Sequence, residues 1–452
     1  MLNKSFSLNV SNQIKPYNKT INVDSDKSIS IRSFLIGAIS HNISEVKNVL
    51  ESGDVFSCIL CLKKLGVKID KIKAKQYLIY GKGLGSFFAN KNAVLDCGNS
   101  ATTARLLVGL LSTNPQIQVK IKGDHSLNKR SMAKLIELMS DFGATFLPKN
   151  KTTFPLTLIS SEMPIGIEYN AGVSAQLKSS VIFAGLNANG VTNIIEKKKN
   201  RDHTENLLLQ SPKILKIKKN KKGQNHIKVY GKGYLDPLKI NVGGDPSSAA
   251  FFTALTLLVK NSHLKIKHVG LNPRRIGFYN LLKKHGAKIK FKNVKKINQE
   301  LVGDIYVQSS KLKAIKANSD YYVSAIDEYP ILFVVAALTQ GVSIFKGIED
   351  LANKESNRIK EMRKILNQIG IKYKSSKNEM KIFGTTELKK IDTTIKVPNL
   401  GDHRICMSTV ILSLVTGIKA EIKNFETVRT SSPSFLKIIK SLGGKFEIKK
   451  TS

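Results

Sequence analysis

A short segment recurs six times along the chain, and each copy has a polar, small-residue start that leads directly into an apolar run of helix length. The starts lie 70 to 83 residues apart, and they fall at Asp26, Gly98, Ser174, Gly244, Asp327 and Gly401. Because the apolar runs have no polar face, the pattern predicts six helices that are buried on all sides.

A second element follows in five of the six intervals. It is an amphipathic helical pattern that ends in glycine and continues into an alternating strand. These stretches end at Ile69, Phe146, Ile289, Tyr373 and Phe446. The third interval, after Thr204, lacks the glycine stop. Each repeat is therefore expected to contain strands and two helices, which indicates an α/β protein.

Six such repeats are too many for one hydrophobic core, so we expect two domains of three repeats. The predicted first domain covers 23–241, and the second covers 1–22 plus 242–452, with the charged stretch 218–244 near the crossover. Helix N-termini carry unpaired N–H groups and the positive end of the helix dipole. If the buried helices direct these ends into a shared cleft, the cleft favours anions, phosphates above all.

The charge of the chain is strongly positive. The chain has 73 Lys and Arg residues and 33 acidic residues, which gives a net charge of +40. Such a charge suggests nucleic acid, an anionic surface or an anionic substrate as the partner. Only ten of these residues are arginine, the side chain that grips carboxylates and phosphates with two parallel hydrogen bonds. A nucleic-acid-binding protein remains an alternative. It predicts aromatic residues among the basic ones, whereas the chain has no Trp and disperses its lysines.

The four cysteines are too few for a disulfide framework and suggest a reducing compartment. Cys58 and Cys61 form a C-x-x-C pattern inside a helix-like run, without the second pair that a zinc site needs. No run of 18 apolar residues exists, and the first residues lack the apolar core of a signal peptide. We therefore expect a soluble, cytoplasmic protein.

Nine short motifs fall at or near the starts of these helices. In order they are Asp26-Lys27-Ser28 with Arg32, Gly98-Asn99-Ser100-Ala101-Thr102 with Arg105, Gly123-Asp124 with Arg130, Ser174-Ala175-Gln176 with Lys178, Arg201-Asp202-His203-Thr204-Glu205, Gly244-Asp245-Pro246-Ser247-Ser248, Asp327-Glu328 with Pro330, Lys354-Glu355-Ser356 with Arg358, and Asp402-His403-Arg404. In this order the motifs resemble the 3-phosphoshikimate 1-carboxyvinyltransferases, also called EPSP synthases.

The resemblance implies two domains, each of three βαβαββ units around buried parallel helices, in the inside-out α/β barrel of the enolpyruvyl transferases. It places the active site in the cleft between them. The implied reaction moves the enolpyruvyl group of phosphoenolpyruvate onto the 5-hydroxyl of shikimate 3-phosphate. It implies no metal or organic cofactor, no nucleic-acid or membrane partner, and a monomer.

The resemblance also implies roles for individual residues. Asp327 would be the general base, Glu355 would move a proton at the methylene carbon, and Lys27 would contact both substrates. The residues implied for shikimate 3-phosphate are Lys27, Ser28, Arg32, Ser174, Ala175, Gln176, Arg201, Asp327 and Lys354. Those implied for phosphoenolpyruvate are Lys27, Ala101, Arg130, Gln176, Arg358 and Arg404.

Some positions separate this chain from other members. Val23-Asp24-Ser25 stands where the family usually has Pro-Gly before the first motif, Ser131 replaces a proline, and 430–433 reads Thr-Ser-Ser-Pro. Ala101 stands where many members have glycine, which resembles the class that glyphosate inhibits weakly.

The sister enolpyruvyl transferase that acts on UDP-N-acetylglucosamine remains an alternative. It carries a reactive cysteine on a loop, whereas Cys97 lies directly before a helix start.

Overall fold

The computed structural model describes residues 5–90, 92–221, 223–388 and 393–450. These residues divide into two compact units. The first unit comprises Ser25–Val242 together with the short segment Lys296–Glu300. The second comprises the described residues up to Asp24, Gly243–Lys295, and the described residues from Leu301 onward.

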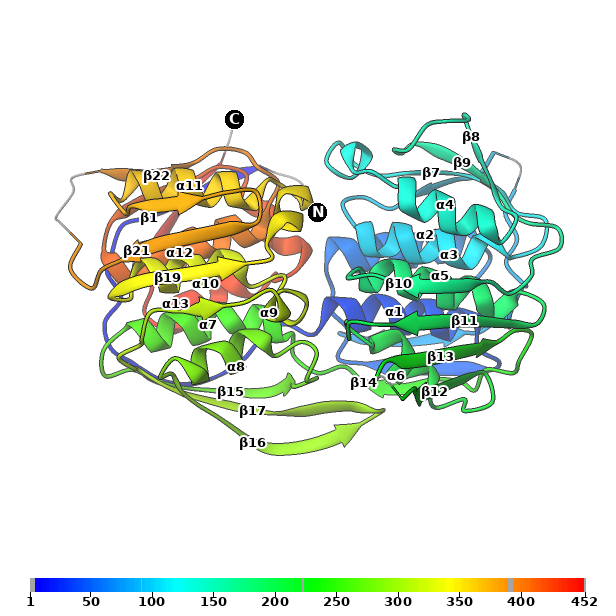
Figure 1. The fold of residues 1–452 in the computed structure, drawn as a ribbon, viewed down its shortest axis with the longest axis horizontal. Coiled ribbons are helices and arrows are strands. Elements are labelled where there is room, and N and C mark those ends of the chain that lie inside the picture. Colours follow the sequence, from blue (N-terminus) through cyan, green and yellow to red (C-terminus); the bar gives the residue numbers. More distant parts are fainter. Residues whose placement is uncertain (1–4, 91, 222, 389–392, 451–452) are drawn as a thin grey trace. The chain divides into compact units, whose positions relative to one another are not determined.

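The first unit holds helices of both kinds that the repeats predict, with strands between them (Figure 1). The helices are α1 (Lys27–Ile39), α2 (Gly53–Lys64), α3 (Ala101–Ser112), α4 (Ala133–Asp141), α5 (Ala175–Asn187), α6 (His203–Leu208) and the 3₁₀ helix η1 (Leu127–Lys129). The strands are β3 (Ile43–Lys47), β4 (Lys68–Lys73), β5 (Gln76–Tyr80), β6 (Val94–Asp96), β7 (Gln118–Lys122), β8 (Thr145–Leu147), β9 (Leu156–Ile159), β10 (Glu168–Ala171), β11 (Val191–Glu196), β12 (Leu215–Lys219), β13 (Asn225–Tyr230) and β14 (Lys239–Asn241).

The second unit repeats this composition, with one additional short α-helix, α9, and one additional 3₁₀ helix. Its helices are α7 (Pro246–Leu258), α8 (Gly277–Lys284), α9 (Asp320–Ser324), α10 (Tyr329–Ala337), α11 (Arg358–Gln368), α12 (His403–Thr416), α13 (Phe435–Ser441), η2 (Glu349–Asn353) and η3 (Phe425–Thr430). Its strands are β1 (Phe6–Val10), β2 (Asn18–Asn22), β15 (His263–Gly270), β16 (Lys288–Ile297), β17 (Glu300–Gln308), β18 (Lys316–Ala317), β19 (Gly341–Lys346), β20 (Tyr373–Ser375), β21 (Glu379–Gly384), β22 (Thr394–Val397), β23 (Lys419–Ile422) and β24 (Phe446–Lys450).

The strands of the described residues form six four-stranded sheets, three in each unit. Their orders are β14-β3-β5-β4, β6-β7-β9-β8 and β10-β11-β13-β12 in the first unit, and β2-β15-β17-β16, β18-β19-β21-β20 and β22-β23-β1-β24 in the second. In each sheet the first pair is parallel and the second is antiparallel. The recurrence of one sheet topology confirms the predicted sixfold α/β repeat.

The six apolar runs form α1, α3, α5, α7, α10 and α12, and their residues are almost all buried, as predicted. The helices of each unit pack against one another, with the sheets around them (Figure 1). Gly109 allows α3 to approach α5 closely, because a Cβ atom there would lie 2.5 Å from the backbone oxygen of Ser180. In the part of the chain that the structure describes, no helix has both the length and the apolar character needed to cross a membrane.

Candidate active site

In the first unit, the N-termini of the buried helices meet at one end. Lys27 begins α1, and its ammonium nitrogen lies 2.9 Å from a carboxylate oxygen of Asp54, near the start of α2. Thr103 of α3 donates a 3.4 Å hydrogen bond to the Asp54 carbonyl. At the start of α5, Gln176 donates to the Thr102 hydroxyl at 2.9 Å. Within this unit the starts of α1, α3 and α5 therefore lie close together, and helix starts present N–H groups that favour an anion.

Side chains cap these helices. Asp26 accepts from the Ile29 amide at 2.8 Å at the start of α1, and Ser174 accepts from the Leu177 amide at 3.3 Å at the start of α5. Ala175 follows as the first residue of α5. A cap residue lies at the mouth of its helix, so capping and substrate contact by Ser174 are compatible.

Arg32 is buried, with 3% of its surface exposed. Its guanidinium donates to the Thr204 hydroxyl at 2.8 Å, the Ser179 hydroxyl at 3.1 Å and the Ser28 carbonyl at 3.0 Å. Thr204 in turn donates to Ser179 at 2.8 Å. The position of Arg32 therefore depends on α6, which supplies Thr204, and on α5, which supplies Ser179.

Lys178 on α5 is completely buried between two carboxylates. Its ammonium lies 2.6 Å from both Glu196 and Glu205, and the contact with Glu196 also has hydrogen-bond geometry. Asn225 donates to the other Glu196 oxygen at 2.6 Å. A buried charge requires such partners, so this cluster fixes α5, β11 and α6 relative to one another.

The loop before Arg130 is tied to the start of α3. Asn99 donates to the Asp124 carboxylate at 2.7 Å, and the Asn128 side chain bonds both the N–H and the carbonyl of Gly123 at 2.9 Å. Arg130 follows η1 as a half-buried residue in extended conformation. Ala101, the first residue of α3, lies in the same region of the unit and is buried.

Two residues of the first unit that the sequence reasoning did not assign to the site prove central to its geometry. Arg105 makes a short hydrogen bond to the side-chain oxygen of Gln176 and so orients that amide. Asp54 pairs with Lys27. Arg105 belongs to the motif that begins at Gly98, so the sequence could have indicated a role for it. Asp54 is an acidic residue in the first turn of α2, where such residues commonly stabilise the helix, so its sequence position does not indicate a functional role. Arg201 is half-buried and lies two residues before the start of α6.

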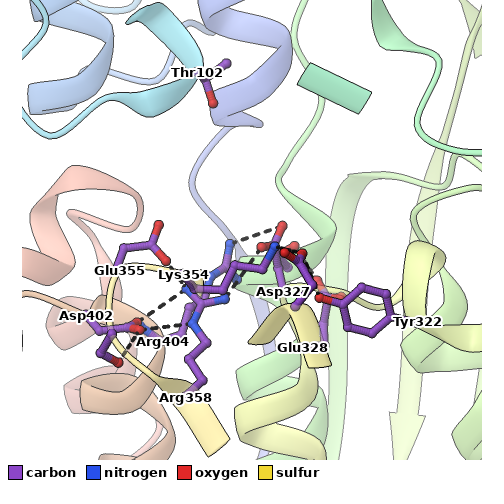
Figure 2. Close-up of polar contacts among 12 residues, drawn as sticks. Thr102, Tyr322, Asp327, Glu328, Lys354, Glu355, Arg358, Asp402 and Arg404 are labelled. Carbon is purple, nitrogen blue, oxygen red and sulfur yellow. Dashed lines mark hydrogen bonds and ion pairs between the residues drawn. The ribbon is translucent and has the colours of Figure 1, made fainter. Parts of the chain in front are cut away.

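In the second unit, Asp327 lies beside two buried arginines (Figure 2). Its carboxylate oxygens are 3.9 Å from Arg358 Nη1 and 4.0 Å from Arg404 Nη2. Arg358 begins α11 and Arg404 is the second residue of α12, whereas Asp327 precedes α10. Three helix starts therefore bring these side chains together.

Arg358 is the centre of this cluster. Its Nη2 lies 2.5 Å from Glu355, and its Nε bonds Asp402 at 3.0 Å. Asp402 also caps α12 by accepting from the Arg404 amide at 2.9 Å. Burial opposes the charge of Arg358, but the nearby carboxylates, Asp402 first, outweigh this effect and raise the pKa of the guanidinium. Arg358 is therefore a permanent cation.

Three guanidinium nitrogens in this cluster are buried and have no hydrogen-bond partner within the described residues. They are Arg358 Nη1 and the Nε and Nη1 atoms of Arg404. Leaving such donors unpaired costs free energy, about 1–3 kcal/mol for a neutral group and more for a charged one. The arrangement thus has donors available for an anion that carries several oxygens.

Lys354 has a partner that the sequence did not reveal. Its ammonium lies 2.6 Å from Asp350, which also accepts from the Tyr322 hydroxyl at 3.0 Å. Lys354 and Tyr322 are labelled in Figure 2. Burial, followed by the charge of Asp350, raises the pKa of Tyr322, so this hydroxyl stays protonated and donates. Asp350 therefore links the Lys354 side chain to Tyr322 of α9.

Behind Asp327, a buried network fixes the start of α10. Glu328 accepts a short hydrogen bond from the Ser247 hydroxyl, and Arg275 donates to Ser247 at 3.0 Å. Arg275 also lies 3.3 Å from Asp245, the N-cap residue of α7. The backbone at Asp327 is therefore anchored through its neighbour Glu328.

The four cysteines are free and buried. A hydrogen bond from Cys61 and burial raise the pKa of the Cys97 thiol well above its usual range. Burial likewise raises the pKa of Cys58. Because the thiolate is the nucleophilic form, Cys58 and Cys97 lack the properties of a reactive catalytic cysteine.

Comparison with known proteins shows the family. Residues 11–439 match the family model described as EPSP synthase (3-phosphoshikimate 1-carboxyvinyltransferase). The chain is 36% identical over 442 residues to the 3-phosphoshikimate 1-carboxyvinyltransferase of Zymomonas mobilis, with 97% of each chain covered. It is 35% identical to the enzyme of that name in Bacillus subtilis, with 94% of this chain and 97% of that one covered.

Comparison with solved structures supports the same family. An EPSP synthase structure from Acinetobacter baumannii matches with a TM-score of 0.84 and 32% identity, over 98% of this chain and 100% of that one. The enolpyruvyl transferase NikO from Streptomyces tendae shares the fold, with a TM-score of 0.75 at 11% identity, over 99% of this chain and 100% of that one. The predicted enolpyruvyl transferase fold is thus confirmed. With the family model covering almost the whole sequence, the chain belongs to the EPSP synthase family, the 3-phosphoshikimate 1-carboxyvinyltransferases of the shikimate pathway.

Proposed function

We propose that the polar clusters of the two units provide the residues for the family's enolpyruvyl transfer to shikimate 3-phosphate. The observation that carries this assignment is the group of three buried guanidinium nitrogens on Arg358 and Arg404, beside Asp327, that have no hydrogen-bond partner within the described residues. Phosphoenolpyruvate carries a carboxylate and a phosphate, and planar guanidinium groups bind both with paired hydrogen bonds. Arg130 of the first unit would add a further positive charge.

The acceptor would bind in the first unit. The helix starts at Lys27, Ser28, Ser174, Ala175 and Gln176, with Arg32 and Arg201, supply hydroxyl, amide and cationic groups suited to a sugar-like phosphate. Lys354 would contribute from the second unit.

In the proposed mechanism, Asp327 takes the proton from the 5-hydroxyl as its oxygen bonds to C2 of phosphoenolpyruvate. Glu355 delivers a proton to the methylene carbon, C3, which completes a tetrahedral adduct. Loss of a proton from the resulting methyl group to Glu355 and cleavage of the C2–O bond to phosphate then restore the alkene and release phosphate. Arg358 holds Glu355 at 2.5 Å and so fixes the direction of its carboxylate. Lys27 would neutralise charge on both substrates.

The test is phosphate release from phosphoenolpyruvate and shikimate 3-phosphate by the wild type and by Asp327→Asn. We expect kcat to fall roughly 10²- to 10⁴-fold, as for the loss of a general base. Asp320→Asn, an exposed carboxylate in the nearby helix α9, is the matched control and should retain wild-type turnover. An Asp327→Asn variant with kcat within twofold of wild type would contradict the assignment. UDP-N-acetylglucosamine in place of shikimate 3-phosphate should give no turnover.

We further propose that glyphosate inhibits the enzyme weakly. Ala101 is the first residue of α3, and its methyl group narrows the space beside the helix start. Because of this narrowing, an inhibitor longer than phosphoenolpyruvate would lose more binding affinity than the substrate does. We also propose a cytoplasmic monomer, and the four free cysteines support the reducing compartment.

A further inference from the structure

The β16–β17 hairpin ends in a buried carboxylate. Asn298 and Gln299 form its two-residue turn, both with positive φ, and Glu300 follows directly as the first residue of β17. Glu300 is only 5% exposed, although the side chains of Lys292–Lys296 on the preceding strand are exposed. The segment Lys296–Glu300 belongs to the first unit, whereas the strand residues on both sides of it belong to the second.

Hydrogen bonds within the first unit hold Glu300 and its turn. One carboxylate oxygen of Glu300 lies 2.7 Å from His203 Nδ1 and accepts from the Asn206 side chain at 3.0 Å. The Asn298 side chain donates to the Lys239 carbonyl of β14 at 2.7 Å. His203 and Asn206 both lie on α6, the helix that begins within the Arg201-Asp202-His203-Thr204-Glu205 motif.

Three consecutive buried residues of α6 each bond a different part of the unit. His203 meets Glu300, Thr204 accepts from Arg32 at 2.8 Å, and Glu205 pairs with Lys178 at 2.6 Å. A helix of six residues has little stability of its own, so these contacts set its position. A shift of α6 at His203 moves Thr204 and with it the partner of Arg32.

We propose that Glu300 is a positioning residue for shikimate 3-phosphate binding: through His203 it fixes α6, and α6 orients Arg32 and the preceding Arg201. The inference rests on the proposed function, in which these two arginines bind that substrate. A displacement of a binding group by about 1 Å can cost on the order of 10²-fold in rate or affinity.

The chemistry of the contact favours this role over simple anchoring of the hairpin. Burying a carboxylate against an imidazole costs desolvation, and an apolar residue of similar size often stabilises as well or better. The carboxylate differs from an apolar residue because its hydrogen bond is directional. A bond to one nitrogen of His203 sets the orientation of the imidazole ring. Glu300 therefore fixes the orientation of the His203 ring, which an apolar contact would not do.

The experiment compares Glu300→Ala, Glu300→Gln and Asp304→Asn with wild type. Asp304 lies on the same strand, where it pairs with Lys265 at 3.1 Å and accepts from the His268 amide at 3.0 Å, so its variant loosens the hairpin away from His203. We measure KM for each substrate, kcat, the melting temperature, and the Kd of shikimate 3-phosphate for the free enzyme by calorimetry.

For Glu300→Ala we expect at least a tenfold rise in the Kd and KM of shikimate 3-phosphate, with the KM of phosphoenolpyruvate within about twofold of wild type, as a displacement confined to the acceptor side implies. Glu300→Gln, whose amide oxygen still accepts a hydrogen bond from His203, should recover most of the affinity. Asp304→Asn should leave the Kd unchanged. If Glu300→Ala does not fold, Glu300→Asp, which keeps the charge but is one methylene shorter, should show the same selective loss.

Two results would overturn the proposal while leaving the family reaction intact. One is unchanged shikimate 3-phosphate affinity in Glu300→Ala or Glu300→Asp. The other is an equal loss for both substrates that Asp304→Asn reproduces, which would indicate a general stability effect. A wild-type protein that neither binds shikimate 3-phosphate nor releases phosphate would instead overturn the proposed function and this inference with it.

Discussion

The carboxylate of Asp24 accepts hydrogen bonds from the Ser432 hydroxyl at 3.1 Å and from the Ser434 amide at 2.8 Å. These residues belong to the segments Val23-Asp24-Ser25 and Thr430–Pro433 with its following serine. Asp24 is buried, and its carbonyl accepts from the Asp245 amide at the cap of α7. The two segments therefore support one another, more than 400 residues apart in sequence.

Replacing Asp24 with Ala should destabilise the protein, because it leaves the Ser432 hydroxyl and the Ser434 amide without their acceptor. We expect a loss of about 1–3 kcal/mol in the free energy of unfolding. Ser432→Ala should cost less, and the double variant should lose less than the sum of the single variants, with a coupling of about 0.5–3 kcal/mol. Urea unfolding followed by circular dichroism measures each value. Strict additivity would show that the two residues do not interact.

Arg404→Lys keeps the charge but removes the planar fork beside Asp327. We expect the KM of phosphoenolpyruvate to rise roughly ten- to a hundredfold, the equivalent of one charge-assisted hydrogen bond of about 1.5–3 kcal/mol. The KM of shikimate 3-phosphate should change little. Arg363→Lys is the matched control, because Arg363 is exposed on α11 and stacks over the Tyr373 ring at 5.4 Å. Equal effects from the two variants would argue against a substrate role for Arg404.

Lys178→Met should be strongly destabilising. The variant leaves the Glu196 and Glu205 carboxylates buried without their cation, and the loss of one partner of a buried ion pair costs about 3–5 kcal/mol. Thermal and urea unfolding measure this change. Lys134→Met removes the exposed ion pair with Glu137 and should leave the unfolding midpoint nearly unchanged. If the unfolding midpoint of Lys178→Met were as high as that of wild type, the Glu196 and Glu205 carboxylates would have another partner that offsets the loss of the Lys178 ammonium.

Ala101→Gly should make the enzyme more sensitive to glyphosate. Removal of the methyl group at the first residue of α3 widens the space beside the helix start, and the KM of phosphoenolpyruvate should stay within a few-fold of wild type. Glycine costs up to about 1 kcal/mol in a helix interior and less at its first residue, so the variant should fold. Inhibition curves at fixed phosphoenolpyruvate provide the measurement. The idea fails if the two proteins give the same inhibition constant.

The repeats could be predicted because each central helix is apolar on every side, and this signal lies within a few turns of sequence. The helix-start motifs could likewise be found, since capping residues such as Asp26, Ser174 and Asp402 stand next to the apolar runs that they cap. The convergence of helix starts then followed from packing within each unit.

Other contacts could not be predicted because their partners are distant in sequence and common in type. Asp54 and Asp350 look like ordinary helix-start acids, and only the fold brings them to Lys27 and Lys354. Glu300 follows an Asn-Gln turn in a lysine-rich hairpin, and nothing nearby marks it as buried. In each case the contact is set by tertiary packing, which local patterns do not contain.

The pairing of β1 with β24 has a consequence for synthesis on the ribosome. The first described strand, β1 (Phe6–Val10), has both of its partners late in the chain. It must wait for β23 (Lys419–Ile422) on one edge and for β24 (Phe446–Lys450) on the other, and β2 must wait for β15. The first unit needs nothing beyond Glu300. Nascent chains should therefore acquire one protease-resistant body well before the other. Until β15 has been translated β2 lacks its partner, and β1 lacks its partners much longer, so these strand edges are exposed to aggregation and to chaperones in the meantime.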